Sequence, residues 1–160
     1  MITTTLNAIR AHEPCESGWK KLLKHLGKRK ADSDPLPLLT ILESNGIDDA
    51  LWCTRAVDGY DALWRHFAVD CAERVLHLTA DYWGKSVLIV ARRHALGDAT
   101  DDELAAAWAA ARAAAERAAA LAAAGAKSVA WDAERKWQAA RFREMLIAEK
   151  WTPVDKEHGK

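Results

Sequence analysis

The sequence has little of what sheets, tight turns and disulfide frameworks require. Its 160 residues include only 8 glycines, 4 prolines and 3 cysteines, and much of its hydrophobic half is alanine. This balance favours helices over strands. The cysteines, Cys15, Cys53 and Cys71, are odd in number and form no Cys-x-x-Cys motif. They therefore indicate reduced thiols in the cytoplasm.

Other sequence features that are missing argue against several classes of function. No apolar run approaches the roughly 18 residues of a membrane span, and residues 1–13 lack the pattern of a signal peptide. The 23 basic residues balance the 23 acidic ones, so net charge favours neither nucleic acid nor a membrane surface. Motifs for a nucleophile elbow, a dinucleotide fold or a P-loop are missing. We expect no catalytic residues, no cofactor and no enzyme.

What the chain does contain is a series of helix signals. We expect an all-α bundle of about seven helices in one domain, residues 1–151, followed by a polar tail, 152–160. The domain would comprise N-terminal helices and a loop (1–34), core helices (35–99) and an alanine-rich helical tract (100–151). The individual segments before that tract are 4–11, 15–27, 35–46, 48–58, 60–80 and 84–97. Ser86–Val90, SVLIV, allows a buried strand as the alternative.

Capping residues mark where the helices begin and end. Gly27 can close the second helix, and Asn45-Gly46 can end the third. Asp48 can cap the fourth. Thr100–Glu103, TDDE, has the form of a capping box at the start of the long tract.

The alanine tract is helical by composition, since sixteen of the 22 residues from Ala105 to Ala126 are alanine. One straight helix over 100–151 would be about 78 Å long, against roughly 40 Å for a compact domain of this size. A monomer should therefore break the tract at 125–128, giving a hairpin. An unbroken rod would instead indicate a homodimer.

Two ten-residue stretches are nearly the same: DALWCTRAVD (49–58) and DALWRHFAVD (61–70). A solenoid unit needs 20 or more residues, and these starts are twelve apart. The similarity therefore predicts two successive helices, by coincidence or local duplication, and no structural repeat.

The helix at 60–80 carries the one constellation that could support chemistry. A helical wheel gives it a wide apolar arc that includes Phe67, Cys71, Val75 and Leu78, and a narrow polar face. That face comprises His66, Asp70, Glu73 and His77. Imidazole and carboxylate groups bind metals in helix bundles, with His94 as a possible further ligand. The spacing matches no metal signature, so we expect an ordinary polar face and no metal.

Two other surfaces are candidates for binding. A basic run could contact phosphates, or could be the solvated side of a short helix: Lys20, Lys21, Lys24, Lys28, Arg29 and Lys30. The segment 129–151 has two apolar sectors, of which one could be open to a partner. Tryptophan is also frequent, at 8 residues, and favours interfaces. The candidate partner-binding residues are Trp131, Trp137, Phe142, Met145 and Trp151.

The stretches SNGIDDALW (44–52) and CAERVL (71–76), together with the alanine tract, resemble a group of small alanine-rich helical proteins of bacteria and their phages. Some members are described as immunity proteins of the Imm-5-like type. The resemblance implies a cytoplasmic, non-enzymatic inhibitor that binds a toxin or another defence component. The alternatives are a helix-bundle metal-binding protein and a nucleic-acid-associated regulator.

Overall fold

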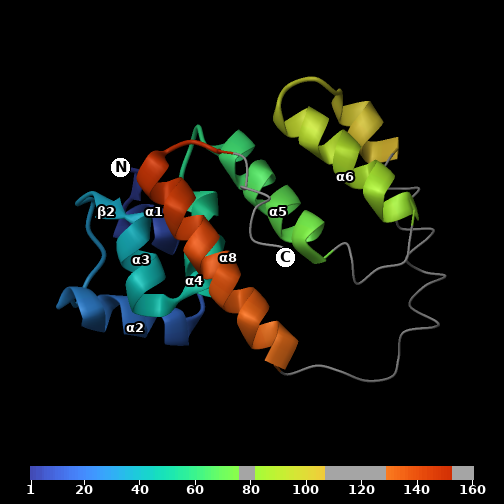
Figure 1. The fold of residues 1–160 in the computed structure, drawn as a ribbon. Helices are drawn as coiled ribbons and strands as arrows, with labels where there is room; N and C mark the ends of the chain where they lie inside the picture. The colour runs from blue at the N-terminus through green and yellow to red at the C-terminus, as the bar shows by residue number, and fades with distance from the viewer. Residues whose placement is uncertain (76–81, 107–128, 153–160) are drawn as a thin grey trace. The chain divides into compact units, whose positions relative to one another are not determined.

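The computed structural model describes residues 1–75, 82–106 and 129–152, and nearly all of its regular structure is α-helical (Figure 1). The predicted all-α class is confirmed. The chain groups into two compact units: Met1–Asp61 with Asp132–Thr152, called unit 1, and Ala62–Trp131 with Pro153–Lys160, called unit 2. Unit 1 therefore combines the two ends of the described chain.

Unit 1 begins with two short helices that have capping residues at their ends. In α1, Leu6–Ala11, the Thr5 hydroxyl accepts a hydrogen bond from the backbone amide of Ala8 at 3.0 Å. In α2, Glu16–Leu26, Cys15 is the N-cap, and Gly27 takes the left-handed conformation (φ 64°) that a C-cap requires. The predicted end of the second helix at Gly27 is confirmed.

A small antiparallel strand pair joins the chain start to the third helix. Strands β1, Thr3–Thr4, and β2, Leu36–Pro37, have two residues each. The sequence did not indicate this pair, because two residues are too few to show an alternating pattern. Beside the pair, the first residue of α3, Leu38–Asn45, donates its backbone amide to the carbonyl of Ile2 at 3.1 Å, and the side chains of Ile2 and Leu38 are both buried.

The junction of α3 and α4 is tighter than the sequence suggested. Helix α4, Ile47–Cys53, starts directly after Gly46, whose φ of 97° lets one glycine end α3 and cap α4. Asp48 therefore lies in the first turn of α4 and is not its N-cap, which corrects the prediction. A short 3₁₀ turn, η1, Thr54–Ala56, follows α4.

Helix α8, Val129–Ala148, completes unit 1. Phe142 and Met145 are 0% and 1% exposed, so they belong to the core and are not surface anchors for a partner. This corrects two of the five partner-binding candidates. Trp137 and Trp151 are half-buried, and the side chain of Trp131 lies outside the described part. The wheel could not show which apolar sector of α8 the N-terminal helices would cover.

In unit 2, helices α5, Asp61–Val75, and α6, Tyr82–Ala95, overlap the predicted segments 60–80 and 84–97. Val87, Ala91 and Ala95 are buried at intervals of four, whereas Ile89 is 63% exposed. This helical period shows that a strand at 86–90 was the wrong alternative. On α5, Phe67 is buried as predicted and Cys71 is half-buried, whereas Leu78 lies outside the described residues.

The capping box at the start of the alanine tract is confirmed. The backbone amide of Glu103 donates to the Thr100 hydroxyl at 3.2 Å, and the amide of Thr100 donates to the Glu103 carboxylate at 2.7 Å. Helix extends over 101–106, and the tract from 107 to 128 lies outside the described residues. The predicted break at 125–128 falls there and stays a prediction.

The two similar stretches occupy different environments. The first spans most of α4 and the whole of η1, whereas the second lies within the single helix α5. Their final aspartates show the difference most clearly, since Asp58 is exposed and Asp70 is buried. The similarity is therefore no structural repeat, as expected.

Over the described ranges, no helix combines the length and apolarity that crossing a bilayer requires.

Candidate binding pocket and a buried ion-pair network

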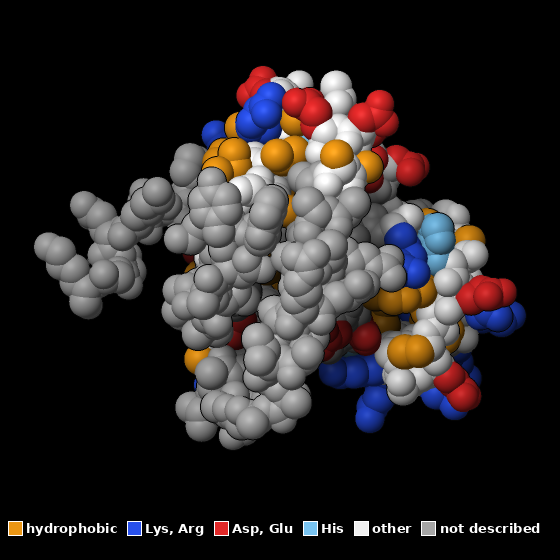
Figure 2. Space-filling view, turned by 90° about the vertical axis from the view of Figure 1, so that its right-hand side faces the viewer, with side chains coloured by type: hydrophobic (Ala, Val, Ile, Leu, Met, Phe, Trp, Pro, Cys, Tyr) orange, Lys and Arg blue, Asp and Glu red, His pale blue; other side chains and the backbone are white. Residues whose placement is uncertain are grey.

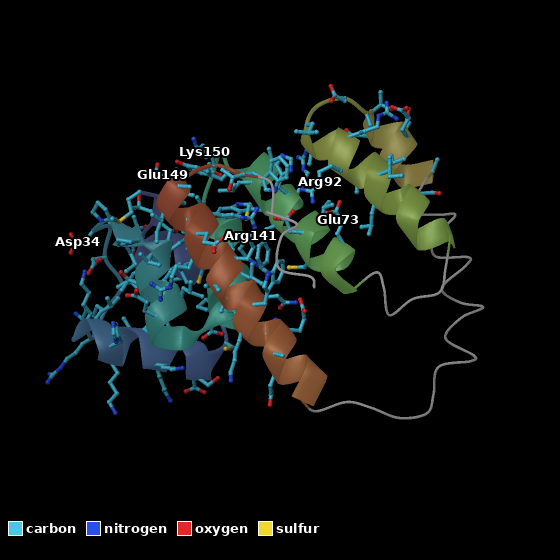
Figure 3. All side chains as sticks on the ribbon, in the orientation of Figure 1. Asp34, Glu73, Arg92, Arg141, Glu149 and Lys150 are labelled. Atoms are coloured by element: carbon cyan, nitrogen blue, oxygen red, sulfur yellow. The ribbon has the colours of Figure 1, made fainter. Side chains whose placement is uncertain are left out.

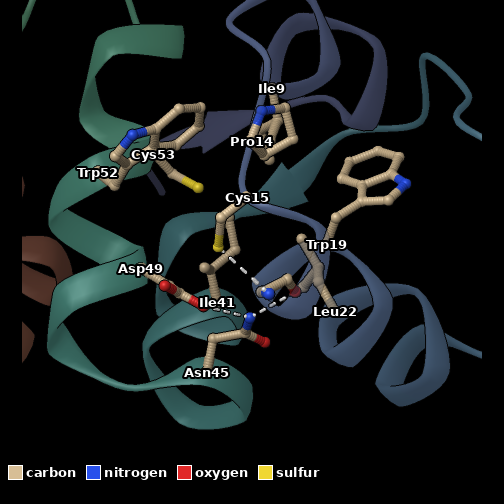
Figure 4. A pocket seen from close by; sticks show the side chains of 11 residues that line it. Ile9, Pro14, Cys15, Trp19, Leu22, Ile41, Asn45, Asp49, Trp52 and Cys53 are labelled. Carbon is tan, nitrogen blue, oxygen red and sulfur yellow. Dashed lines mark hydrogen bonds between the residues drawn. The ribbon is translucent and has the colours of Figure 1, made fainter.

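Unit 1 contains a pocket of about 80 Å³ between the start of α2 and helices α3 and α4 (Figure 4). Trp19 from α2 and Trp52 from α4 lie on opposite sides of it. Most of the remaining wall is apolar and includes Ile9, Leu22 and Ile41. A cavity of roughly 150 Å³ can hold benzene, so this pocket fits the end of one side chain.

The polar side of the pocket is organised by Asn45, the last residue of α3. Its side-chain amide donates to the carbonyl of Gly18 at 2.9 Å and to the Asp49 carboxylate at 2.7 Å. The hydroxyl of Ser44 donates to the amide oxygen of Asn45 at 2.8 Å. Asn45 thereby links α2, α3 and α4, and holds Asp49 in place at the pocket.

Gly18 allows α2 to approach α4 at this point. A Cβ on Gly18 would lie 2.7 Å from Oδ2 of Asp49 and 3.1 Å from Sγ of Cys15. The first distance is shorter than real Cβ contacts, so a larger residue would displace the carboxylate. The absence of a side chain at Gly18 therefore allows Asp49 to keep its position in the pocket wall.

Two thiols also line the pocket, and their environments differ. Cys15 is exposed, and its sulfur accepts a hydrogen bond from the backbone amide of Gly18 at 3.4 Å. Cys53 is buried, and this burial, reinforced by the Asp49 carboxylate, raises the pKa of its thiol to about 12. The Cys53 thiol is therefore neutral at physiological pH and behaves as part of the apolar wall.

Each indole already has a guanidinium over its ring. The Arg10 guanidinium carbon lies 5.9 Å from the ring centroid of Trp19, and that of Arg55 lies 4.3 Å from the ring centroid of Trp52. Both distances are within the range of cation–π attraction. Both tryptophans are half-buried. The neighbouring guanidinium groups help to hold the two rings in their orientation.

In unit 2, two residues of the predicted polar face of α5 are buried, whereas Glu73 is exposed. His66 and Asp70 are only 7% and 3% exposed. Arg92 of α6 points toward this face, where its Nη2 donates to Asp70 at 2.6 Å and to Glu73 at 3.0 Å (Figure 3). Its Nη1 lies 3.2 Å from Nδ1 of His66. The expected ordinary polar face is thus an ion-pair network with His66 and Asp70 at its buried end, which corrects that interpretation.

The network assigns a protonation state to His66. Burial lowers the pKa of His66, the Arg92 charge lowers it further, and the Asp70 carboxylate opposes both effects. Because Arg92 has only donors, Nδ1 of a neutral His66 accepts its hydrogen bond. The proton of the neutral ring is therefore on Nε2.

This arrangement argues against a metal at the predicted ligands. The Arg92 guanidinium contacts His66, Asp70 and Glu73, so a divalent cation would have to displace a positive charge. His77 lies outside the described residues, and within them no cluster of three His, Cys, Asp or Glu side chains could hold a metal ion. The further candidate, His94, has its Nε2 2.6 Å from Asp101.

The basic run is partly neutralised within unit 1. Lys20 pairs with Glu16 at 2.5 Å, and Lys28 pairs with Asp32 and Asp34 at 2.6 and 2.8 Å. Lys21 donates to the carbonyl of Asn45 at 3.2 Å. Figure 2 shows both acidic and basic side chains among the described residues of another face. These pairs reduce the charge that the run could offer to phosphates.

Comparisons with protein-family models, with curated proteins and with solved structures found no match to this chain.

The pocket of unit 1 was not predicted by the sequence analysis. Its walls come from residues 9–22 and 41–53, and no periodicity connects two segments so far apart. The only local signals were Asn45-Gly46, which indicated a turn, and the high tryptophan content.

Proposed function

We propose that this protein is a non-enzymatic, protein-binding inhibitor of the immunity or anti-defence type, which acts by occupying the surface of a partner protein. The observation that carries the proposal is the pocket of unit 1, where Trp19 and Trp52 flank an apolar space of about 80 Å³. Half-buried tryptophans around such a pocket are typical of the energetic centres of protein interfaces.

The size of the pocket favours a protein partner over a small-molecule substrate. Small-molecule sites usually measure about 300–1,000 Å³, several times the volume found here. A pocket of this volume suits one anchoring side chain of a larger partner. The resemblance to immunity proteins of bacteria and phages supports a toxin or a defence component as that partner, although it covers mainly residues 35–146.

The decisive experiment is affinity capture from the source cell with the full chain and two matched variants. Trp52→Ala removes one wall of the pocket, whereas Ile147→Ala alters an exposed apolar residue of α8 in the same unit. We expect wild type and Ile147→Ala to retain the same protein. Trp52→Ala should weaken its binding by about 30-fold, the equivalent of roughly 2 kcal/mol for an interface hot spot.

The captured protein is then assayed for its own activity with increasing amounts of the chain. We expect inhibition that is complete at an equimolar ratio. Retention of no protein, or equal retention by Trp52→Ala when circular dichroism shows that variant to be folded, would contradict the proposal.

A further inference from the structure

We infer that the pocket accepts a lysine side chain of the partner protein, with the methylene stem against Trp19 and Trp52 and the ammonium group beside Asp49. This inference rests on the proposed function and specifies the chemistry of the partner. It starts from the charge of the pocket. Asp49 is the single Asp, Glu, Lys or Arg side chain in the wall.

The two neighbouring aspartates of α4 differ in how they are neutralised. Asp48 is 83% exposed and pairs with Arg135 of α8. Asp49 is half-buried, accepts a hydrogen bond from Asn45, and makes no ion pair with any other described residue. A carboxylate offers about four acceptor positions, so Asp49 can accept a further donor from a positive group.

The rest of the pocket selects for an amphipathic cation. Lysine buries an apolar stem while keeping its charged end at a polar group. Apolar walls with one carboxylate therefore complement lysine better than a purely aliphatic side chain.

The hydrogen bonding of Asp49 favours lysine over arginine. A guanidinium binds a carboxylate best with two parallel hydrogen bonds, one to each oxygen. Oδ2 of Asp49 already accepts a hydrogen bond from Asn45 at 2.7 Å, so a guanidinium would have to share that oxygen with Asn45. An ammonium group needs only one oxygen, and Oδ1 can supply it.

The inference is tested on the full chain with two capped amino acids of the same stem length. N-acetyl-lysine amide carries an ammonium group where N-acetyl-norleucine amide carries a methyl group. Binding is followed by the indole N–H signals of Trp19 and Trp52 in a ¹⁵N-labelled sample, assigned with Trp19→Phe and Trp52→Phe. We expect saturable shifts of both signals, with the lysine probe binding at least fivefold more tightly.

The matched variants are Asp49→Asn and Asp48→Asn. Asp49→Asn should abolish the preference for the lysine probe, and Asp48→Asn should leave it unchanged. A second measurement needs no variant: added salt should weaken binding of the lysine probe and not that of the norleucine probe.

Three results would overturn the inference. The first is equal or tighter binding of the norleucine probe. The second is a lysine preference that survives in folded Asp49→Asn and is insensitive to salt. The third is tighter binding of 1,4-diaminobutane than of the lysine probe. The last result would assign the pocket to a free amine. Equal binding of norleucine would leave the proposed function standing, because that proposal fails only in the capture experiment.

Discussion

At the scale of single residues, burial and partnership decide what an ionisable group does. His66, Asp70 and Glu73 have the composition of a metal site, yet Arg92 uses the same atoms as hydrogen-bond partners. Asp70 is almost completely buried, so its charge needs this partner. In unit 1, Asp48 and Asp49 are adjacent in sequence and differ in the same respect: one is paired at the surface and the other lines a pocket.

Replacing Arg92 by leucine should destabilise unit 2 strongly. The substitution removes the Arg92 guanidinium from the buried Asp70 carboxylate, and removing one partner of a buried ion pair costs about 3–5 kcal/mol. Urea unfolding followed by circular dichroism measures the loss.

Arg93→Leu is the matched control at the next position. Arg93 is exposed, donates to the carbonyl of Asp98 at 2.7 Å and lies 3.7 Å from Glu103. Because these contacts are at the surface, the control should change stability by no more than about 1 kcal/mol. Equal losses for the two variants would show that the network contributes nothing specific.

The stability of the protein should fall as the pH drops below about 6.5. Because the folded-state pKa of His66 is lowered, the unfolded chain takes up a proton near pH 6.5 that the folded chain does not. The stabilisation is therefore present above that pH and is lost as the pH falls through the folded pKa.

His66→Gln keeps a neutral acceptor for Arg92 and removes the titration. Free energies of unfolding at several pH values between 5 and 7.5 should therefore depend less on pH in this variant. An unchanged slope would mean that His66 is not the group responsible.

At the scale of elements, short helices of unit 1 are held by specific contacts at their ends. Asn45 connects the carbonyl of Gly18 in α2 with Asp49 in α4. Gly46 turns the chain between α3 and α4 within a single residue. Such short helices are unstable in isolation, so these contacts and the buried apolar faces determine their packing.

Gly18→Ala should destabilise the protein by about 1–3 kcal/mol, as overpacking does. Alanine improves helix propensity by about 1 kcal/mol, but its Cβ would meet Oδ2 of Asp49 at 2.7 Å. Thermal unfolding gives the net effect.

Ser17→Ala serves as the control in the same helical turn. The Ser17 side chain is exposed, and its hydroxyl lies 3.6 Å from the sulfur of Cys15. This variant should be as stable as wild type or slightly more so. If Gly18→Ala were also neutral or stabilising, the close approach of α2 to α4 would not be rigid.

At the scale of the whole molecule, unit 1 is assembled from segments at the two ends of the described chain. Phe142, Met145 and Leu146 of α8 are buried, and Arg143 pairs with Glu43 of α3 at 2.7 Å. The amino group of Met1 pairs with Glu149 just after α8. Residues 1–61 alone would therefore lack a large part of their core.

A rearranged unit 1 should fold by itself. In this rearranged protein, residues 129–152 come first and residues 1–61 follow. A flexible linker of about six residues, which spans roughly 13 Å, joins the two segments. We expect cooperative unfolding and helical circular dichroism, because the contact between Met1 and Glu149 shows that the ends are close.

Residues 1–61 without α8 provide the comparison and should show no cooperative transition. A cooperative transition in this shorter chain, or none in the rearranged one, would show that α8 is not an integral part of unit 1.

The sequence by itself determined the local features of this protein. Composition and apolar periodicity predicted the all-α class correctly. Gly27 and the capping box at Thr100–Glu103 correctly marked the end of one helix and the start of another. These features depend on interactions within one turn of backbone, so the nearby residues suffice to specify them.

Only the tertiary structure decided which helical faces are covered and which side chains meet. The wheel placed His66 and Asp70 on a polar face, but it could not show that Arg92, more than twenty residues away, would contact both. It could not distinguish the sector of α8 that carries Phe142 and Met145 from an open surface. The pocket between Trp19 and Trp52 likewise depends on how α2, α3 and α4 pack. Such contacts join residues that are distant in sequence, so they depend on how the whole unit packs. Local sequence patterns describe only neighbouring residues and therefore could not predict them.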